Sequence, residues 1–340
     1  MDGDAGVARP ATVPITDLHA HYLAPSVVRR LQGGEAQPHI RVDDAAGSTR
    51  FAFPSSVSRT LEPRMTDLTD RLRHLDECGI EVQVLSTWID MFGYDLPEDV
   101  AAHYHVWINE GLAQAVEEHP DRLRFFASVP LPWSDAAAAV LRDAVERLGA
   151  VGAMIGTNVC GKYLDDPRLS PLWAEAEALE VPIQLHPVDP AGSDRLTDHQ
   201  LANFLGNPFD TVVAAASLIL GGVLDRHPLL RVVLVHGGGY LPYAVGRIGH
   251  GRRVRNVAPT LAREPVEYLD RFAFDTVVYE PRVLRVLSAL VGTDHLVLGT
   301  DYPFDMEPPD VVNAVRSSLG EEALAQTARN AARLLDRRGR

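Results

Sequence analysis

Residues 15–21 of the chain read ITDLHAH, a short apolar run that ends in two histidines one residue apart. In an extended strand successive side chains alternate between two faces, so Asp17, His19 and His21 are expected on the same face. Two imidazoles on one face can hold a divalent metal ion, although an isolated His-x-His pair can equally be a polar strand end. The motif therefore predicts a strand whose role depends on what the other strands carry.

Further apolar runs follow, and an amphipathic segment separates each run from the next. We expect strands at residues 15–21, 82–87, 123–129, 151–157, 181–186, 231–236, 272–278 and 295–301. Their nearly continuous apolar character is typical of parallel strands buried on both faces. Strands in this number, alternating with helices, predict an α/β protein with a single (β/α)8 TIM barrel. A doubly wound open sheet is disfavoured, because no glycine-rich phosphate loop follows the first strand.

Capping residues mark the expected helices between the strands. Thr66 is placed to cap a helix that ends at Gly79. Ser170, followed by a proline, is a typical helix start, and Ser134 opens an alanine-rich helix before the fourth strand. These signals support the alternation of strand and helix that a barrel requires.

Residues beyond a minimal barrel fall in three insertions of one domain at residues 15–340. We expect them near residues 22–65, 189–208 and 249–270, each after a strand and therefore on the catalytic face. Residues 1–14 have no basic start and no apolar core, so we expect a flexible N-terminus and not a secretory signal.

Composition excludes several classes of protein. The 340-residue chain has 32 Lys+Arg against 46 Asp+Glu, and its net charge of -14 argues against nucleic-acid binding. The longest apolar stretch, residues 211–224, is shorter than the ~20 residues of a membrane span. Cys78 and Cys160 are too few for a disulfide framework, and we expect both to be small buried thiols. These features predict a cytoplasmic protein with no membrane or nucleic-acid partner.

Four of the predicted strands end in a histidine or a carboxylate. His19 and His21 end the first strand, His186 the fifth, His236 the sixth and Asp301 the eighth. In a parallel barrel these ends meet at one rim, where barrel enzymes keep their catalytic groups. Imidazole and carboxylate ligands suit zinc, with manganese or iron(II) as alternatives. The sequence therefore predicts a metal site at this rim.

Two neighbouring residues are not expected to be ligands. Asp17 lies deeper in the first strand and is predicted to be a buried hydrogen-bonding partner. Lys162 follows the fourth strand, where some two-metal barrels use a carboxylated lysine, but it sits in a polar loop. We therefore expect one metal ion per chain.

The motifs that surround these residues resemble a known family. DLHAH (17–21), LHP (185–187), VHGGG (235–239) and LGTDYPF (298–304) are similar to the amidohydrolase superfamily. The stretches at 83–99 and 236–248 narrow the resemblance to the aminocarboxymuconate semialdehyde decarboxylase branch, from about residue 15 to 335. This resemblance implies a (β/α)8 barrel that is a zinc-dependent, non-oxidative decarboxylase of a small unsaturated or aromatic carboxylic acid.

Carried over by position, the resemblance also implies roles at the metal. His19, His21, His186 and Asp301 would ligate one zinc ion, and no organic cofactor is expected. His236 would be an acid/base group beside metal-bound water and not a ligand, a separation that the sequence alone does not make. Asp301 is a second candidate for returning the proton.

The same resemblance implies the residues that bind substrate. Arg59 is the best match to an arginine that binds the substrate carboxylate, with Arg64 as the alternative. Arg247 corresponds to an arginine that reaches into the neighbouring subunit's site, which implies a homodimer. Phe204 corresponds to an aromatic residue near the substrate. A guanidinium group suits a carboxylate, because its donors pair with both oxygens.

The residues by themselves leave other functions open. Water activated at the metal could instead attack an amide, a lactone or a C–C bond, which would make the protein a metal-dependent hydrolase. A non-catalytic barrel used for binding is a third alternative. Release of CO2 from a carboxylated substrate distinguishes the decarboxylase from both.

Overall fold

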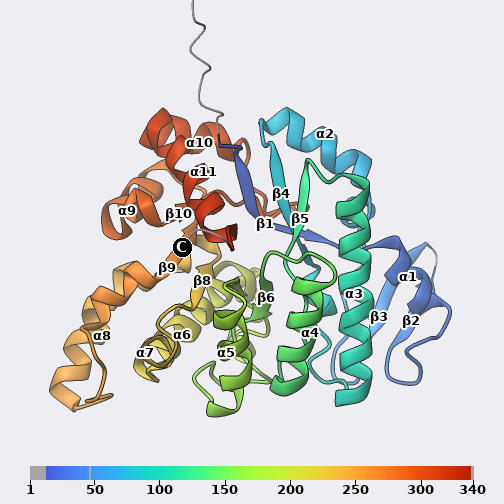
Figure 1. The fold of residues 1–340 in the computed structure, drawn as a ribbon, viewed down its shortest axis with the longest axis horizontal. Coiled ribbons are helices and arrows are strands. Elements are labelled where there is room, and N and C mark those ends of the chain that lie inside the picture. Colours follow the sequence, from blue (N-terminus) through green and yellow to red (C-terminus); the bar gives the residue numbers. More distant parts are fainter. Residues whose placement is uncertain (1–12, 46, 338–340) are drawn as a thin grey trace, which may run out of the picture.

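Parallel strands form a ring at the centre of the computed structural model, which describes residues 13–45 and 47–337 (Figure 1). Around the ring they are β1 (Thr16–Tyr22), β4 (Val82–Thr87), β5 (Leu123–Phe125), β6 (Ala153–Gly156), β7 (Pro182–His186), β8 (Arg231–Leu234), β9 (Phe272–Asp275) and β10 (Leu296–Val297). Residues 1–12, which hold most of the predicted flexible N-terminus, lie outside the described residues.

Isolated bridges close the ring where regular pairing stops. The backbone N–H of Leu18 donates to the carbonyl of Leu298 over 2.9 Å, which joins β1 to the chain after β10. The N–H of Ala127 donates to the carbonyl of Gly152 over 2.8 Å, which joins the chain after β5 to the start of β6. The predicted α/β class and (β/α)8 barrel are confirmed.

Five strands, β5, β6, β8, β9 and β10, end earlier than predicted, and at β8 and β10 the missing residues include site residues. β8 stops at Leu234 and β10 at Val297, before the residues that the sequence places at their ends. The backbone is left-handed at His236 (φ 54°) and at Asp301 (φ 63°). A left-handed residue breaks a strand, and in a non-glycine residue this conformation is strained and concentrated at functional sites.

Helices follow the strands, mostly as predicted. They are α1 (Pro25–Gln32), α2 (Leu68–Cys78), α3 (Glu98–Glu118), α4 (Ser134–Glu146), α5 (Ser170–Ala178), α6 (Asn207–Leu220), α7 (Val223–Arg226), α8 (Leu241–Arg255), α9 (Pro281–Val291), α10 (Val311–Leu319) and α11 (Glu321–Leu335). The cap of α2 is Asp67 and not the predicted Thr66, because the carboxylate of Asp67 accepts from the N–H of Asp70 over 3.0 Å. Gly79 ends α2 with φ 70°, as predicted.

A β-bulge makes β1 irregular. The register between β1 and β4 shifts between Asp17 and Ala20, so one residue more is accommodated in β1. The prediction that Asp17 shares a face with His19 and His21 is therefore wrong. Asp17 accepts from the amide of Gln83 over 2.7 Å on the side of the sheet that α2 covers. Its predicted role as a buried hydrogen-bonding partner is confirmed.

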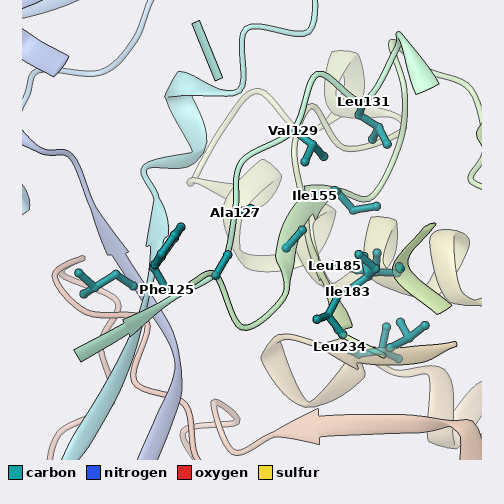
Figure 2. Close-up of a cluster of buried hydrophobic side chains, with 14 of the residues drawn as sticks. Phe125, Ala127, Val129, Leu131, Ile155, Ile183, Leu185 and Leu234 are labelled. Carbon is teal, nitrogen blue, oxygen red and sulfur yellow. The ribbon is translucent and has the colours of Figure 1, made fainter. Parts of the chain in front are cut away.

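Apolar side chains pack in two layers, inside the ring and between the ring and the helices. The inner layer takes one residue from nearly every strand or its extension, as in a filled barrel: Leu18, Val84, Phe126, Met154, Val233, Ala273 and Val297. The outer layer includes Phe125, Ile155, Ile183, Leu185 and Leu234 (Figure 2). Adjacent residues such as Phe125 and Phe126 enter different layers because side chains alternate along a strand.

The three predicted insertions contain secondary structure of their own. Residues 22–65 form α1 and an antiparallel hairpin, β2 (Arg41–Ala45) with β3 (Ser48–Ala52), which lie beside α3 (Figure 1). Residues 202–206 form a π-helical turn that continues into α6. Position 249 falls inside α8, which extends outward from the barrel (Figure 1). No helix among the described residues is long and apolar enough to cross a membrane, and the cytoplasmic location stays a prediction.

Candidate metal centre and active site

Four histidine rings meet at the carboxyl ends of the strands. His19 and His21 come from β1, His186 from β7 and His236 from the turn after β8. The ring centroid of His19 lies 5.4 Å from that of His21 and 5.2 Å from those of His186 and His236. Strand ends that are far apart in sequence therefore bring four of the predicted site residues together.

Asp301 joins this group from the chain after β10. Its Oδ1 lies 3.2 Å from Nε2 of His19 and 3.3 Å from Nε2 of His21, and its Oδ2 lies 3.6 Å from Nε2 of His236. Donor atoms of His19, His186, His236 and Asp301 all lie within 4.8 Å of one another, a spacing that one metal ion can bridge. This group contains His236 and not His21, although Nε2 of His21 lies within 3.3 Å of Asp301, so distance does not by itself divide ligands from other groups.

Hydrogen bonds at the far nitrogen orient three of the rings. The Nδ1 of His19 is 2.7 Å from Oδ2 of Asp275, that of His21 is 3.1 Å from the carbonyl oxygen of Thr87, and that of His186 is 3.0 Å from the carbonyl oxygen of Pro187. An Nδ1–H donated to such an acceptor leaves the lone pair on Nε2, the arrangement typical of histidines that bind metal.

The atoms that face the centre are themselves unbonded. Nε2 of His19, His21 and His186 and Oδ1 of Asp301 are buried, and none has a hydrogen-bond partner within the described chain. Buried polar atoms are nearly always bonded, so a converging set of unbonded acceptors requires an explanation. Three imidazoles and a carboxylate are a donor set that fits a divalent cation.

His236 is held differently from the other three rings. Its Nδ1 is buried and has no hydrogen-bond partner among residues 13–45 and 47–337, so no acceptor fixes its tautomer. Its side chain is 14% exposed and lines the cavity above the centre. His236 therefore faces the position that a substrate would occupy.

Electrostatics also favour a cation at the centre. Burial would lower the pKa of His19, but Asp301 and Asp275 on either side raise it to about 10. Burial lowers the pKa of His21, and burial together with the other imidazoles lowers that of His186 well below its usual value, so both are neutral. Burial would raise the pKa of Asp301, but His19 and its neighbours hold it well below its usual range. His21, His186 and Asp301 therefore have the protonation states that metal ligands need, whereas His19 has to lose a proton when it binds an ion.

Asp275 is the site residue that the sequence interpretation missed. Besides His19 it accepts from the backbone N–H of Gly237 over 2.7 Å and of Val277 over 3.1 Å. It therefore connects β9 to β1 and to the turn that carries His236. Asp275 is the last residue of β9 but lies in the middle of the strand predicted at 272–278, so the predicted strand, which was three residues too long, hid a carboxylate at a strand end.

A cavity of about 260 Å³ opens over the metal centre. Its wall is largely apolar and aromatic, with a few polar groups, which is typical of a small-molecule site. The residues that line it include Arg59, His186, Phe204, His236, Asp301 and Phe304. A cavity of this size suits a compound with a single ring.

Of the two candidate arginines, Arg59 reaches the cavity. Its guanidinium group lies 4.8 Å from the ring centroid of Phe304, and its NH2 donates to Asp90 over 2.7 Å. Arg64 instead packs over Tyr302 at 4.7 Å and is not among the described residues that line the cavity. The structure therefore brings Arg59 and not Arg64 to the site.

The remaining predicted residues lie at the edge of the site or away from it. Phe204 lines the cavity from the π-helical turn and is 51% exposed. Arg247 is exposed on α8 and is outside the described cavity lining. Lys162 is exposed, as predicted, whereas Cys160 is exposed and Cys78 only partly buried, so the prediction of two buried thiols is wrong. Cys160 follows the carboxyl end of β6 in a surface turn, where the core does not cover it.

Comparison with known proteins agrees with this site. The amidohydrolase family profile matches residues 16–337. The 2-amino-3-carboxymuconate-6-semialdehyde decarboxylase of Dictyostelium discoideum is 35% identical over 263 residues, which cover 76% of this chain and 73% of the relative. The gamma-resorcylate decarboxylase of Rhodococcus jostii is 32% identical over 287 residues, 79% of this chain and 87% of the relative.

A solved structure extends the likeness to the fold. The dihydroxybenzoic acid decarboxylase of Polaromonas sp., which has manganese and 2-nitroresorcinol bound, superposes with a TM-score of 0.76 at 27% identity over 94% of this chain and 97% of that one. The chain thus belongs to the amidohydrolase family, in the branch of the aminocarboxymuconate semialdehyde and resorcylate decarboxylases.

Proposed function

We propose that this protein is a metal-dependent, non-oxidative decarboxylase of a small aromatic or unsaturated carboxylic acid. One observation carries the proposal: unbonded imidazole and carboxylate atoms converge beneath a single-ring cavity that also contains the guanidinium of Arg59. The relatives across most of the chain are named as decarboxylases of such acids.

His19, His21, His186 and Asp301 are the proposed ligands of one zinc ion. The Nδ1 partners support this choice, since ligand histidines almost always donate their second N–H to a carboxylate or carbonyl. His19, His21 and His186 each have such a partner, and His236 has none among the described residues. Zinc suits this set of three nitrogens and one oxygen, and manganese is the alternative that a bound metal in a relative supports.

The cavity orients the acid through its charged and aromatic groups. Asp90 accepts from Nε and NH2 of Arg59 and holds one edge of the guanidinium, so the rest of it is available to a substrate carboxylate. Phe304 and Phe204 offer faces against which an unsaturated ring can pack. These contacts keep the ring over the metal centre and beside His236.

The reaction exchanges a carboxylate for a proton. The C–C bond to the carboxylate breaks, CO2 leaves, and the electron pair stays on the ring carbon. A divalent cation in the site supplies Lewis acidity that stabilises the negative charge developing on the substrate. His236, as the imidazolium, donates its proton to that carbon and is protonated again from solvent. Asp301, next to it, stabilises the imidazolium between turnovers.

The active unit is proposed to be a homodimer. Arg247 is exposed on α8, which extends away from its own barrel (Figure 1), and Tyr243 on the same helix is 86% exposed. A second copy packed along α8 would cover Tyr243 and receive Arg247. Mixing an Arg247→Ala chain with a His236→Ala chain tests this, because mixed dimers regain activity only if the arginine acts in the partner's site. No recovery after demonstrated subunit exchange would confine Arg247 to its own chain.

The activity itself is tested by CO2 release. The protein is stripped with a chelator, reloaded with Zn²⁺ or Mn²⁺, and assayed against gamma-resorcylate, 2-amino-3-carboxymuconate-6-semialdehyde and a panel of related acids. We expect CO2 from the reloaded protein and none from the stripped protein. Hydrolysis of an amide or lactone panel, with no CO2 from any acid, would establish the hydrolase instead.

A further inference from the structure

Arg71 is a completely buried arginine whose charge meets no carboxylate directly within the described chain. It lies on α2, outside the catalytic cavity, and its side chain reaches the strands beneath. Its NH1 donates to Oε1 of Gln83 over 2.6 Å, and its NH2 donates to the carbonyl oxygen of His21. Burying a charge without an ionic partner is unfavourable. An apolar residue of similar size at this position would therefore give a more stable fold.

Two tyrosine rings enclose the guanidinium. Its central carbon lies 4.5 Å from the ring centroid of Tyr302 and 5.4 Å from that of Tyr22. Tyr22 directly follows His21, and Tyr302 directly follows Asp301. Cation–π contacts strengthen when the cation is desolvated. Arg71 therefore binds the chain immediately after two residues of the metal centre.

Gln83 extends the contact to a third point. Its Nε2 donates to Oδ2 of Asp17 over 2.7 Å. Asp17 accepts in turn from Oγ1 of Thr300 over 2.7 Å and from the backbone N–H of His19 over 2.9 Å. One network, from α2 through β4, thus reaches the backbone on both sides of the bulge in β1 and the segment that leads to Asp301.

The network joins segments that the regular pairing does not. β10 is two residues long, and the chain from Leu298 to Tyr302 meets β1 through isolated bridges and four backbone hydrogen bonds, two of which run from the N–H groups of Thr300 and Asp301 to the carbonyl of His19. The separation between β1 and Asp301 is therefore set by few backbone hydrogen bonds, and the side-chain network supplies the rest. Burial lowers the pKa of Arg71 to about 10, so the guanidinium stays charged at neutral pH.

We propose that Arg71 is a positioning residue of the metal centre. It holds the ends of β1 and β10 at the separation at which His19, His21 and Asp301 bind one ion, and it does so from the opposite side of the strands. This inference rests on the ligand set given under Proposed function. Arg71 differs in this role from the residues that touch substrate, because Arg71 affects the affinity and the coordination of the metal ion.

The test measures metal binding directly. Arg71→Met, Arg71→Lys and Gln83→Met are compared with the parent protein by chelator competition for Zn²⁺ and by the visible spectrum of the Co²⁺ form. We expect Arg71→Met to bind Zn²⁺ about 10- to 100-fold more weakly, the range for partners that orient metal ligands. Arg71→Lys, which keeps the charge but concentrates its donors on one nitrogen, should fall between Arg71→Met and the parent. The Co²⁺ spectrum should shift in Arg71→Met, and at saturating metal kcat should fall more than KM rises.

Two control variants make the result decisive. Asn330→Ala removes a buried side chain that donates to the carbonyls of Thr293 and Leu296 at the other end of β10, so it lowers stability far from the metal. It should bind Zn²⁺ like the parent. His186→Ala should lose the ion.

Parent-like Zn²⁺ affinity and Co²⁺ spectrum in Arg71→Met, with loss of metal in His186→Ala, would overturn the positioning role alone. If Arg71→Met does not fold, parent-like affinity in both Arg71→Lys and Gln83→Met overturns it in the same way. Retention of the ion by His186→Ala would refute the ligand set, and this inference with it.

Discussion

The barrel has one rim at the amino ends of its strands, the amino rim, and one at their carboxyl ends, the carboxyl rim. Both rims contain hollows and buried polar groups, but the hydrogen bonding of those groups differs. At the amino rim a hollow of about 750 Å³ is lined by residues whose donors have protein acceptors. Asn330 donates to the carbonyl of Leu296 over 2.7 Å, and Arg271 donates to that of Pro228 over 2.7 Å. At the carboxyl rim a cavity of about 260 Å³ lies over imidazole and carboxylate atoms that lack partners in the described chain.

This comparison shows that volume is a poor guide to function in this molecule. The larger hollow lies where barrels carry stability, and the smaller one lies where they carry chemistry. Unbonded buried acceptors cost free energy and left-handed residues store strain, so residues that combine the two features call for a functional explanation. His236 and Asp301 combine the two features.

The largest expected difference between the rims is in metal binding. His186→Ala removes a proposed ligand and should abolish both retention of the ion and CO2 release, as should chelation of the parent protein. Asn330→Ala, at the amino rim, should keep both. Metal analysis of the dialysed proteins, together with the CO2 assay, checks this. A His186→Ala protein that keeps one metal ion per chain would contradict the assignment of His186 as a ligand.

Within the carboxyl rim, His236→Ala should separate catalysis from metal binding. We expect turnover to fall on the order of 10²- to 10⁴-fold, the contribution of a general acid or base, while the metal content stays at about one ion per chain. Steady-state kinetics and metal analysis of the same preparation measure both effects. If the variant loses its ion as His186→Ala does, His236 is a ligand.

A smaller effect on kcat/KM should distinguish Arg59, which lines the cavity, from Arg64, which does not. Arg59→Ala should lower kcat/KM about 10- to 100-fold, because a hydrogen bond to a charged group contributes roughly 1.5–3 kcal/mol. Arg64→Ala is the matched control, since Arg64 packs over Tyr302 away from the cavity, and its kcat/KM should stay within about twofold. Equal losses in both variants would remove the assignment of Arg59.

The smallest effect on activity should come from the amino rim itself. Asn330→Ala leaves one buried and one partly buried carbonyl without their donor and should lower the free energy of unfolding by about 1–3 kcal/mol. Its kcat/KM should match that of the parent. Urea denaturation and kinetics on the same protein check both values. A loss of turnover without a loss of stability would show that Asn330 affects catalysis at the carboxyl rim.

Much of the barrel and of the candidate metal centre could be predicted from local sequence. Continuous apolar runs that end in His186, His236 or Asp301 indicate parallel strands with polar carboxyl ends, and a barrel brings such ends together. The predictions that failed depend on single residues in their backbone context. Asp67 caps α2 in place of Thr66 because its carboxylate reaches an N–H in the first turn, and either residue type suits a cap. The exposure of Cys160 depends on the turn after β6, which no periodic pattern marks.

The fold class, the strand ends and the kinds of side chain that meet there follow from local sequence, because hydrophobic periodicity and residue chemistry are local properties. The bulge that turns Asp17 toward α2, the partner of His19 and the burial of Arg71 become apparent only in the folded chain. Asp275 lies 256 residues from His19, and Gln83 lies 66 residues from Asp17. Such contacts depend on how distant strands register against one another, and no local pattern contains that register.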